Sequence, residues 1–171
     1  MALINFMNVS KNFKNKVFSK NVILSLIIIF FVFTSDRVSK VIIIKHQLNS
    51  NSLFVNDYLN LELVWNTGIS FGIFSQNANI YYHSTTLLIF FVMVFLSYLI
   101  NKANFLDKIF LSLIFGGALG NLYDRLLYFA VPDFIDLHIN DYHWFTFNIA
   151  DIFITIGIIL IIGKDLILNK K

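Results

Sequence analysis

Residues 109–130 read IFLSLIFGGALGNLYDRLLYFA, and this stretch decides the fold class. A helix needs about 20 mainly apolar residues to cross the hydrocarbon layer of a bilayer, and this stretch is long enough. Gly116, Gly117 and Gly120 lie at helical spacing, and small residues in that pattern let membrane helices approach closely. The stretch therefore predicts a membrane helix that packs tightly against its neighbours.

The composition of the whole chain agrees with a membrane protein. Of its 171 residues, 57% are hydrophobic and only 13% are charged, whereas soluble domains have about 45–50% and about 25%. A single domain of this length cannot bury so much apolar surface in a soluble core. The chain has no cysteine, which excludes disulfides and thiol nucleophiles, and its net charge of +3 suits anionic lipid better than nucleic acid.

Three further apolar stretches accompany the first, and together they predict an α-helical integral membrane protein. The fold expected is one membrane domain over residues 1–171, a four-transmembrane-helix bundle with a small outward-facing β element. A basic tail over residues 1–19 precedes the first helix. The four helices are expected at about 20–44, 81–100, 109–130 and 144–163.

The first apolar stretch could also belong to a cleaved signal peptide, since it follows basic residues. It ends in Thr34-Ser35-Asp36-Arg37, without a small-x-small cleavage site, and apolar residues resume at Val41. One long helix is therefore the better interpretation.

Residues 45–80 are polar and include a stretch from Tyr58 to Trp65 in which leucines alternate with other residues. This alternation predicts a strand, and we expect an extracytoplasmic β element here. A second polar segment follows Pro132, and we expect it to form a mobile loop, up to Trp144, that acts as a gate.

The distribution of Lys and Arg predicts the orientation in the membrane. The N-terminal tail, residues 101–108 and the C-terminal tail hold four, two and three basic residues, whereas the other two connections hold only Lys45. By the positive-inside rule both termini are cytoplasmic, and Trp65 and Trp144 lie at the outer interface.

Four carboxylates fall at or near the predicted outer ends of the helices: Asp36, Asp124, Asp133 and Asp151. Ionisable groups are costly in a membrane and usually functional there. Two close carboxylates share one proton, so that one can take a proton from water while the other donates to a carbonyl oxygen. The structural alternative is that each aspartate pairs with a nearby cation, such as Arg37, Lys40 or Arg125.

Five motifs carry a resemblance to a known family, in its order and spacing over about residues 20–165. They are Asp36-Arg37-x-x-Lys40, Asn66-Thr67-Gly68-Ile69-Ser70-Phe71-Gly72, the segment from Gly116 to Asp124-Arg125, Val131-Pro132-Asp133-Phe134-Ile135-Asp136, and Phe147-Asn148-Ile149-Ala150-Asp151. The set closely resembles the lipoprotein signal peptidase (signal peptidase II) family.

The resemblance implies a catalytic dyad of Asp133 and Asp151. The other carried-over residues are polar groups around the dyad or substrate (Asn66, Gly68, Asn121, Asp124, Arg125 and Asn148) and structural support for the first helix (Asp36 and Lys40). Asp124 is a rival for the dyad, but the adjacent Arg125 is expected to keep it ionised. This chemistry needs no metal or cofactor, and none is predicted, since the four histidines lack helical metal-ligand pairing.

The resemblance also implies the reaction and its setting. The enzyme would be an aspartic endopeptidase that removes signal peptides from diacylglyceryl-modified prolipoproteins, cutting just before the lipidated cysteine. It would be a monomer in the bacterial cytoplasmic (inner) membrane, in contact with membrane lipid, with its active site near the outer leaflet. Cyclic peptides of the globomycin type would inhibit it.

Two features depart from the family pattern. Pro132 replaces a small aliphatic residue, and no glycine lies in the segment 126–130, where one is usual. Both affect the expected shape of this loop. The alternative functions are a small proton-coupled transporter or channel subunit, because intramembrane aspartates also relay protons, and a non-catalytic membrane scaffold, which would leave the paired carboxylates unexplained.

Overall fold

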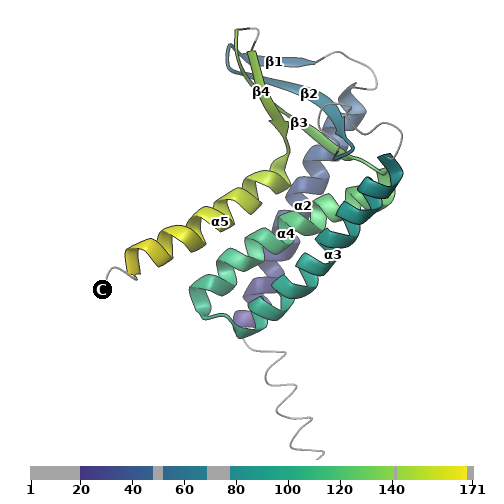
Figure 1. Cartoon of the computed structure of the whole chain (residues 1–171). Helices are drawn as coiled ribbons and strands as arrows, with labels where there is room; N and C mark the ends of the chain where they lie inside the picture. The colour runs from purple at the N-terminus through teal and green to yellow at the C-terminus, as the bar shows by residue number, and fades with distance from the viewer. Residues whose placement is uncertain (1–19, 48–51, 69–77, 141, 169–171) are drawn as a thin grey trace, which may run out of the picture.

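The computed structural model describes residues 20–47, 52–68, 78–140 and 142–168, and Figure 1 shows their arrangement. A four-stranded sheet lies at one end of the helices. The elements in chain order are α2 (Lys20–Gln47), β1 (Leu53–Asn56), β2 (Leu59–Asn66), α3 (Ala78–Lys102), α4 (Phe105–Tyr128), β3 (Val131–Ile139), β4 (Tyr142–Phe147) and α5 (Ile149–Leu168).

Helix α4 is the centre of the helical layer, since it packs against α2, α3 and α5. Its glycines make the close approach possible. A Cβ atom on Gly116 would lie 2.8 Å from Val32 Cβ, one on Gly117 would lie 2.5 Å from the backbone oxygen of Ala150, and one on Gly120 would lie 2.5 Å from Asp36 Oδ2. The predicted packing role of the glycine face is thus confirmed.

We expect Gly117→Ala to lower the free energy of unfolding by about 1–3 kcal/mol, as overpacking does in tight cores. The added methyl group meets the backbone of α5, which cannot rotate away as a side chain can. Thermal unfolding in detergent measures the change. The matched control is Gly163→Ala, where the new Cβ meets nothing within 4 Å and helix propensity improves. Equal melting temperatures for the two variants would contradict this account.

Among the described residues, three helices are long and apolar enough to cross a membrane: Lys20–Gln47, Tyr82–Lys102 and Phe105–Tyr128. Helix α5 is shorter, at 20 residues, and carries Asp151, Lys164 and Asp165. Lys164 forms an ion pair with Asp107 of α4 at the end far from the sheet. The structure is therefore a membrane fold of three apolar helices and a small antiparallel sheet, and the fourth span stays a prediction.

The sheet has the order β1-β2-β3-β4, with all neighbours antiparallel. The strand predicted at 58–65 is confirmed as β2. The predicted β element at 45–80 was slightly too long, because α2 continues to Gln47 and α3 begins at Ala78. Residues 48–51 and 69–77 of that element lie outside the described residues.

Two predictions about residues 131–147 were wrong. The segment expected to be a loop is a β hairpin, β3 and β4, and the fourth helix begins at Ile149 instead of about 144. Trp144 therefore lies in β4. The gating role of this segment stays a prediction. The aromatic residues at 142–147 favour a strand, but their high hydrophobicity also continues the apolar run of α5, so hydrophobicity alone did not separate the two.

The structure shows where the two departures from the family pattern lie in the backbone. Phe129 ends α4 in the left-handed region, at φ 56, where glycine is the usual residue. Pro132 lies in β3 before Ile135, which is the first residue paired with β4. Its missing N–H therefore removes no hydrogen bond to β4.

Candidate active site

A buried charge cluster joins α2 to α4. Lys40 Nζ donates hydrogen bonds to Asp36 Oδ2 at 2.8 Å, Asp124 Oδ2 at 2.7 Å and Asn121 Oδ1 at 3.0 Å. Arg37 Nη1 lies 2.6 Å from Asp124 Oδ1. The side chains of Asp36, Lys40 and Asp124 are fully buried. The cluster pairs each buried carboxylate with a cation, as burial in a low-dielectric interior requires.

Of the three cations considered as partners of the aspartates, Arg37 and Lys40 are confirmed for Asp124, and the expectation that the adjacent Arg125 keeps it ionised was wrong. Its cations are Lys40 and Arg37 from α2, and among the described residues the adjacent Arg125 forms no ion pair. Neighbours in sequence on a helix point in different directions, so Arg125 faces away from Asp124.

Arg125 lies instead beside α3 and the end of β2. Its guanidinium carbon is 5.4 Å from the ring centroid of Tyr82, whose hydroxyl donates to the Arg125 backbone oxygen at 2.6 Å. Gly68 has φ +76, and a Cβ atom there would lie 3.1 Å from Arg125 Nη1. Arg125 and Gly68 are thus brought together, and only glycine fits that position without strain.

Asn148, between β4 and α5, contacts both predicted catalytic carboxyl groups. Its side-chain amide donates to Asp133 Oδ1 at 2.6 Å, and its backbone N–H donates to Asp151 Oδ2 at 3.1 Å. Its side-chain oxygen accepts from the backbone N–H of Asp151 at 3.1 Å. This reciprocal pattern is the one that caps a helix N-terminus, so the start of α5 fixes Asp151 next to Asp133.

Each carboxyl group has one further asparagine donor. Asn66 Nδ2 donates to Asp133 Oδ2 at 2.9 Å, and Asn121 Nδ2 donates to Asp151 Oδ1 at 2.8 Å. Asn121 also accepts from Lys40, so it joins the buried charge cluster to Asp151. Asn66 accepts from the backbone N–H of Gly68 at 2.7 Å, which fixes the turn after β2.

The electrostatic setting of Asp133 suits proton exchange. Burial raises the pKa of Asp133 to about 6; hydrogen bonds from Asn66 and Asn148 partly oppose this, and the Asp151 charge adds to it. A carboxyl group with such a pKa can gain and lose a proton near neutral pH, as a general acid must.

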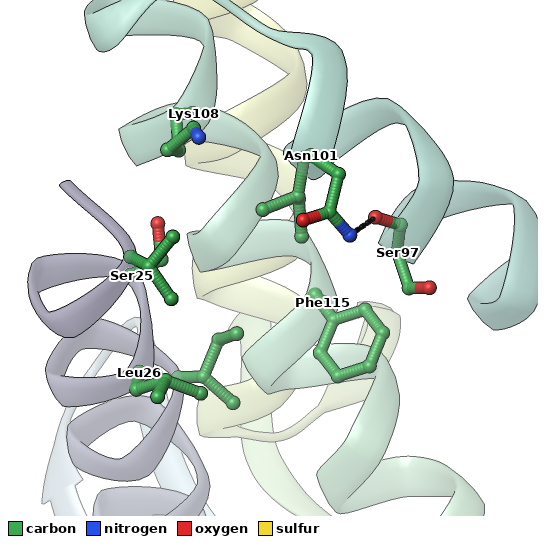
Figure 2. A pocket seen from close by; sticks show the side chains of 9 residues that line it. Ser25, Leu26, Ser97, Asn101, Lys108 and Phe115 are labelled. Atoms are coloured by element: carbon green, nitrogen blue, oxygen red, sulfur yellow. Dashed lines mark hydrogen bonds between the residues drawn. The ribbon is translucent and has the colours of Figure 1, made fainter. Parts of the chain in front are cut away.

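Asp151 also lines an apolar hollow of about 240 Å³ together with side chains of β3, β4 and α5, among them Leu137, Phe147 and Ile152. A second hollow lies at the other end of the helices (Figure 2), where Ser25 and Leu26 of α2 face Asn101 and Lys108. No described residue lining it is acidic, so of these two hollows only the first contains a carboxyl group of the predicted dyad.

Comparison with known proteins identifies the family. The model of the signal peptidase (SPase) II family matches residues 28–167. The chain belongs to the signal peptidase II family. The lipoprotein signal peptidase of Pelagibacter ubique (strain HTCC1062) is 45% identical over 159 residues, 92% of this chain and 96% of that protein. The enzyme of Anaplasma phagocytophilum (strain HZ) is 42% identical over 147 residues, 84% of this chain and 92% of that protein.

Two solved structures share the fold. Both are described as bacterial membrane enzymes determined by the in meso method, at 2.3 Å and 1.9 Å resolution. The first is 36% identical, with a TM-score of 0.71 over 88% of this chain and 93% of that one. The second is 35% identical, with a TM-score of 0.72 over 84% and 92%.

This signal peptidase II is therefore an aspartic-type peptidase of the bacterial inner membrane, and it removes signal peptides from prolipoproteins. The resemblance inferred from the five motifs is confirmed. The family favours the peptidase over the transporter, channel subunit and scaffold alternatives.

Sequence reasoning did not assign a role to two residues that support the site. Gln47 accepts from Leu63 N at 2.7 Å and donates to Leu61 O at 3.0 Å, which fixes the end of α2 to β2. Tyr82 holds Arg125. Gln47 and Tyr82 lie near helix ends and belong to none of the five motifs, so the sequence did not indicate their roles.

Proposed function

We propose that Asp133 and Asp151 are the catalytic dyad with which this signal peptidase II cleaves diacylglyceryl-modified prolipoproteins. The observation that carries the proposal is the contact of Asn148 with both carboxyl groups, which fixes their relative position. No other pair of described carboxyl groups is held in this way without a cation beside it.

Asp133, whose pKa burial raises to about 6, is the acid in this reaction, and Asp151 is the base. Asp151 takes a proton from water, the water oxygen attacks the scissile carbonyl carbon, and Asp133 gives its proton to the carbonyl oxygen. Asp151 then protonates the leaving nitrogen as the C–N bond breaks, and Asp133 takes a proton back from the tetrahedral diol. The dyad returns to its starting state without a metal or a covalent intermediate.

The other polar residues support this chemistry. Asn66, Asn121 and Asn148 orient the carboxyl groups, and Asp36, Lys40 and Asp124 hold α2 against α4 behind them. Arg125 and Gly68 lie to one side, where a guanidinium next to an open backbone can bind a peptide carbonyl of the substrate.

The proposed placement puts the sheet end of the molecule at the outer leaflet and both termini in the cytoplasm. Lys102 ends α3, Lys108 lies near the start of α4 and Lys164 near the end of α5. These helix ends lie away from the sheet (Figure 1), as the positive-inside rule expects for a cytoplasmic side. With α5 as the fourth span, the lipid on the cysteine holds the scissile bond at the membrane boundary, beside the dyad. The apolar hollow at Asp151 accommodates an apolar part of the substrate. The enzyme acts as a monomer, and cyclic peptides of the globomycin type compete for the same site.

The pH dependence of cleavage tests the role of Asp133. If Asp133 must be protonated, kcat/KM falls as pH rises above about 6. The hydrogen bond from Asn66 stabilises the ionised carboxylate, so Asn66→Ala removes a cause that lowers the pKa. We therefore expect the alkaline limb of the Asn66→Ala profile to move to higher pH.

Measurement of kcat/KM from pH 4 to 9 in detergent, with purified prolipoprotein, checks this expectation. Asn101→Ala is the control, since Asn101 lies at the other end of the helices, in the hollow of Figure 2. A profile that falls in overall height but keeps its limbs in place would show that Asn66 only supports the fold.

A further inference from the structure

The hairpin of β3 and β4 carries a second cluster of chemically active side chains: Asp136, His138 and His143. Asp136 and His138 are two residues apart on β3, and His143 of β4 is the register partner of His138. One ligand atom from each lies within 4.8 Å of the others. Alternate residues of a strand share a face, so the strand geometry gathers these three groups.

The cluster lies on the opposite face of the sheet from the dyad. Asp133 and Leu137 are separated by an even number of positions on β3, and Leu137 shares a hollow with Asp151. Asp136 and His138 occupy the alternate positions of β3, whose side chains point to the other face of the sheet, away from the active site. A group bound by them is therefore separate from the peptidase reaction.

The polar atoms of the cluster are incompletely paired. Asp136 Oδ2 lies 2.7 Å from His143 Nδ1 and 3.6 Å from His138 Nδ1. His138 is only 9% exposed, and its Nδ1 atom is buried without a hydrogen-bond partner among the described residues. A buried unpaired nitrogen is costly, and this one is aimed at the same carboxylate oxygen as its neighbour. A cation between the three groups would satisfy all of them.

We propose that Asp136, His138 and His143 bind a divalent transition metal ion of the zinc class. Two imidazoles and a carboxylate suit such an ion, whereas Mg²⁺ and Ca²⁺ prefer oxygen ligands alone. Three protein ligands leave a fourth position for water. A polar hollow of about 520 Å³, lined by Asp57, Tyr58 and His138, gives solvent access. The bound ion would cross-link β3 to β4, the hairpin that joins Asp133 to the start of α5 (Figure 1).

Titration of the purified full-length protein with Zn²⁺ in detergent, followed by calorimetry, tests the proposal. We expect one ion per chain, and an affinity at least about 100-fold weaker in His143→Ala, since loss of even an outer partner of a ligand costs about 10–100-fold. The His143 side chain is 54% exposed, so this variant keeps its fold. His83→Ala, which removes another exposed histidine from α3, is the matched control and should bind as the parent does.

Two further readouts separate a metal site from a hydrogen-bonded cluster. Zn²⁺ should raise the melting temperature of the parent and His83→Ala but not of His143→Ala. Co²⁺ should give visible d–d absorption in the parent that Asp136→Asn alters. Equal Zn²⁺ affinity in the parent and His143→Ala, or equal losses in His143→Ala and His83→Ala, would overturn the proposal. It would also fail if His143→Ala lowered the melting temperature while no protein bound Zn²⁺.

Discussion

Asp133→Asn and Asp151→Asn are each expected to lower kcat for prolipoprotein cleavage by at least about a thousandfold. General acid and base catalysis contribute about 10²–10⁴-fold each, and in the proposed reaction each aspartate performs both in turn. The carboxamide keeps the size of the carboxyl group and can still bond to Asn148, so substrate binding should change little. Cleavage of a purified diacylglyceryl-modified prolipoprotein in detergent measures the loss.

Two control variants distinguish loss of catalysis from other effects of replacing an aspartate. Asp57→Asn changes an exposed aspartate in the turn between β1 and β2 and should leave kcat unchanged. Asp124→Asn should retain part of the activity. Asp124 pairs with Lys40 and Arg37, so its loss should lower the stability of the fold and not remove a reacting group. Loss at Asp124 and Asp151 with activity retained at Asp133 would mean that the dyad has been assigned to the wrong pair.

Lys40→Met is expected to destabilise the protein by about 3–5 kcal/mol, the usual result of removing one partner from a buried ion pair. Lys40 Nζ binds Asp36, Asp124 and Asn121, and methionine satisfies none of them. The charge of Asp36 would lose its closest cation, whereas Asp124 would still pair with Arg37 Nη1 at 2.6 Å. Thermal unfolding and the yield of monodisperse protein in detergent measure the effect.

A second substitution distinguishes lost charge balance from lost packing. Asp36→Asn in the Lys40→Met background removes the uncompensated charge and should restore more than half of the lost stability, because neutral pairs of similar volume are tolerated. If Lys40→Met alone were as stable as the parent, the buried charge cluster would have no structural role. If the second change restored nothing, the defect would lie in packing.

Much of the fold could be predicted because the sequence signals were long. Apolar stretches of about 20 residues indicate membrane helices directly, and three of the four were confirmed as apolar helices long enough to span. The hairpin at 131–147 was missed for a physical reason. Its residues are aromatic and apolar but also polar at intervals, and pairing with β2, 65 or more residues earlier in the chain, decides their conformation.

The sequence predicted which residues lie together at the candidate site but not all of their partners. The motifs indicated Asp133, Asp151 and their asparagines, and the structure places Asn66 and Asn148 on Asp133 and Asn121 on Asp151. The cation beside Asp124 was assigned by sequence adjacency, whereas packing of α2 on α4 supplies it from 84 residues away. The histidines were tested against helical spacing alone, although strand spacing gathers His138 and His143.

The hydrogen bond from Ala150 N to Asp36 Oδ1, at 3.0 Å, has a consequence for biosynthesis. It joins the first described helix to the last, and Asn148 and Asp151 lie at the same junction. The ribosome must therefore synthesise α5 before the proposed dyad can assemble. A nascent chain that ends before Ile149 lacks Asp151 and leaves Asp36 without the donor at Ala150, so the proposed site cannot form during membrane insertion until α5 joins the other helices.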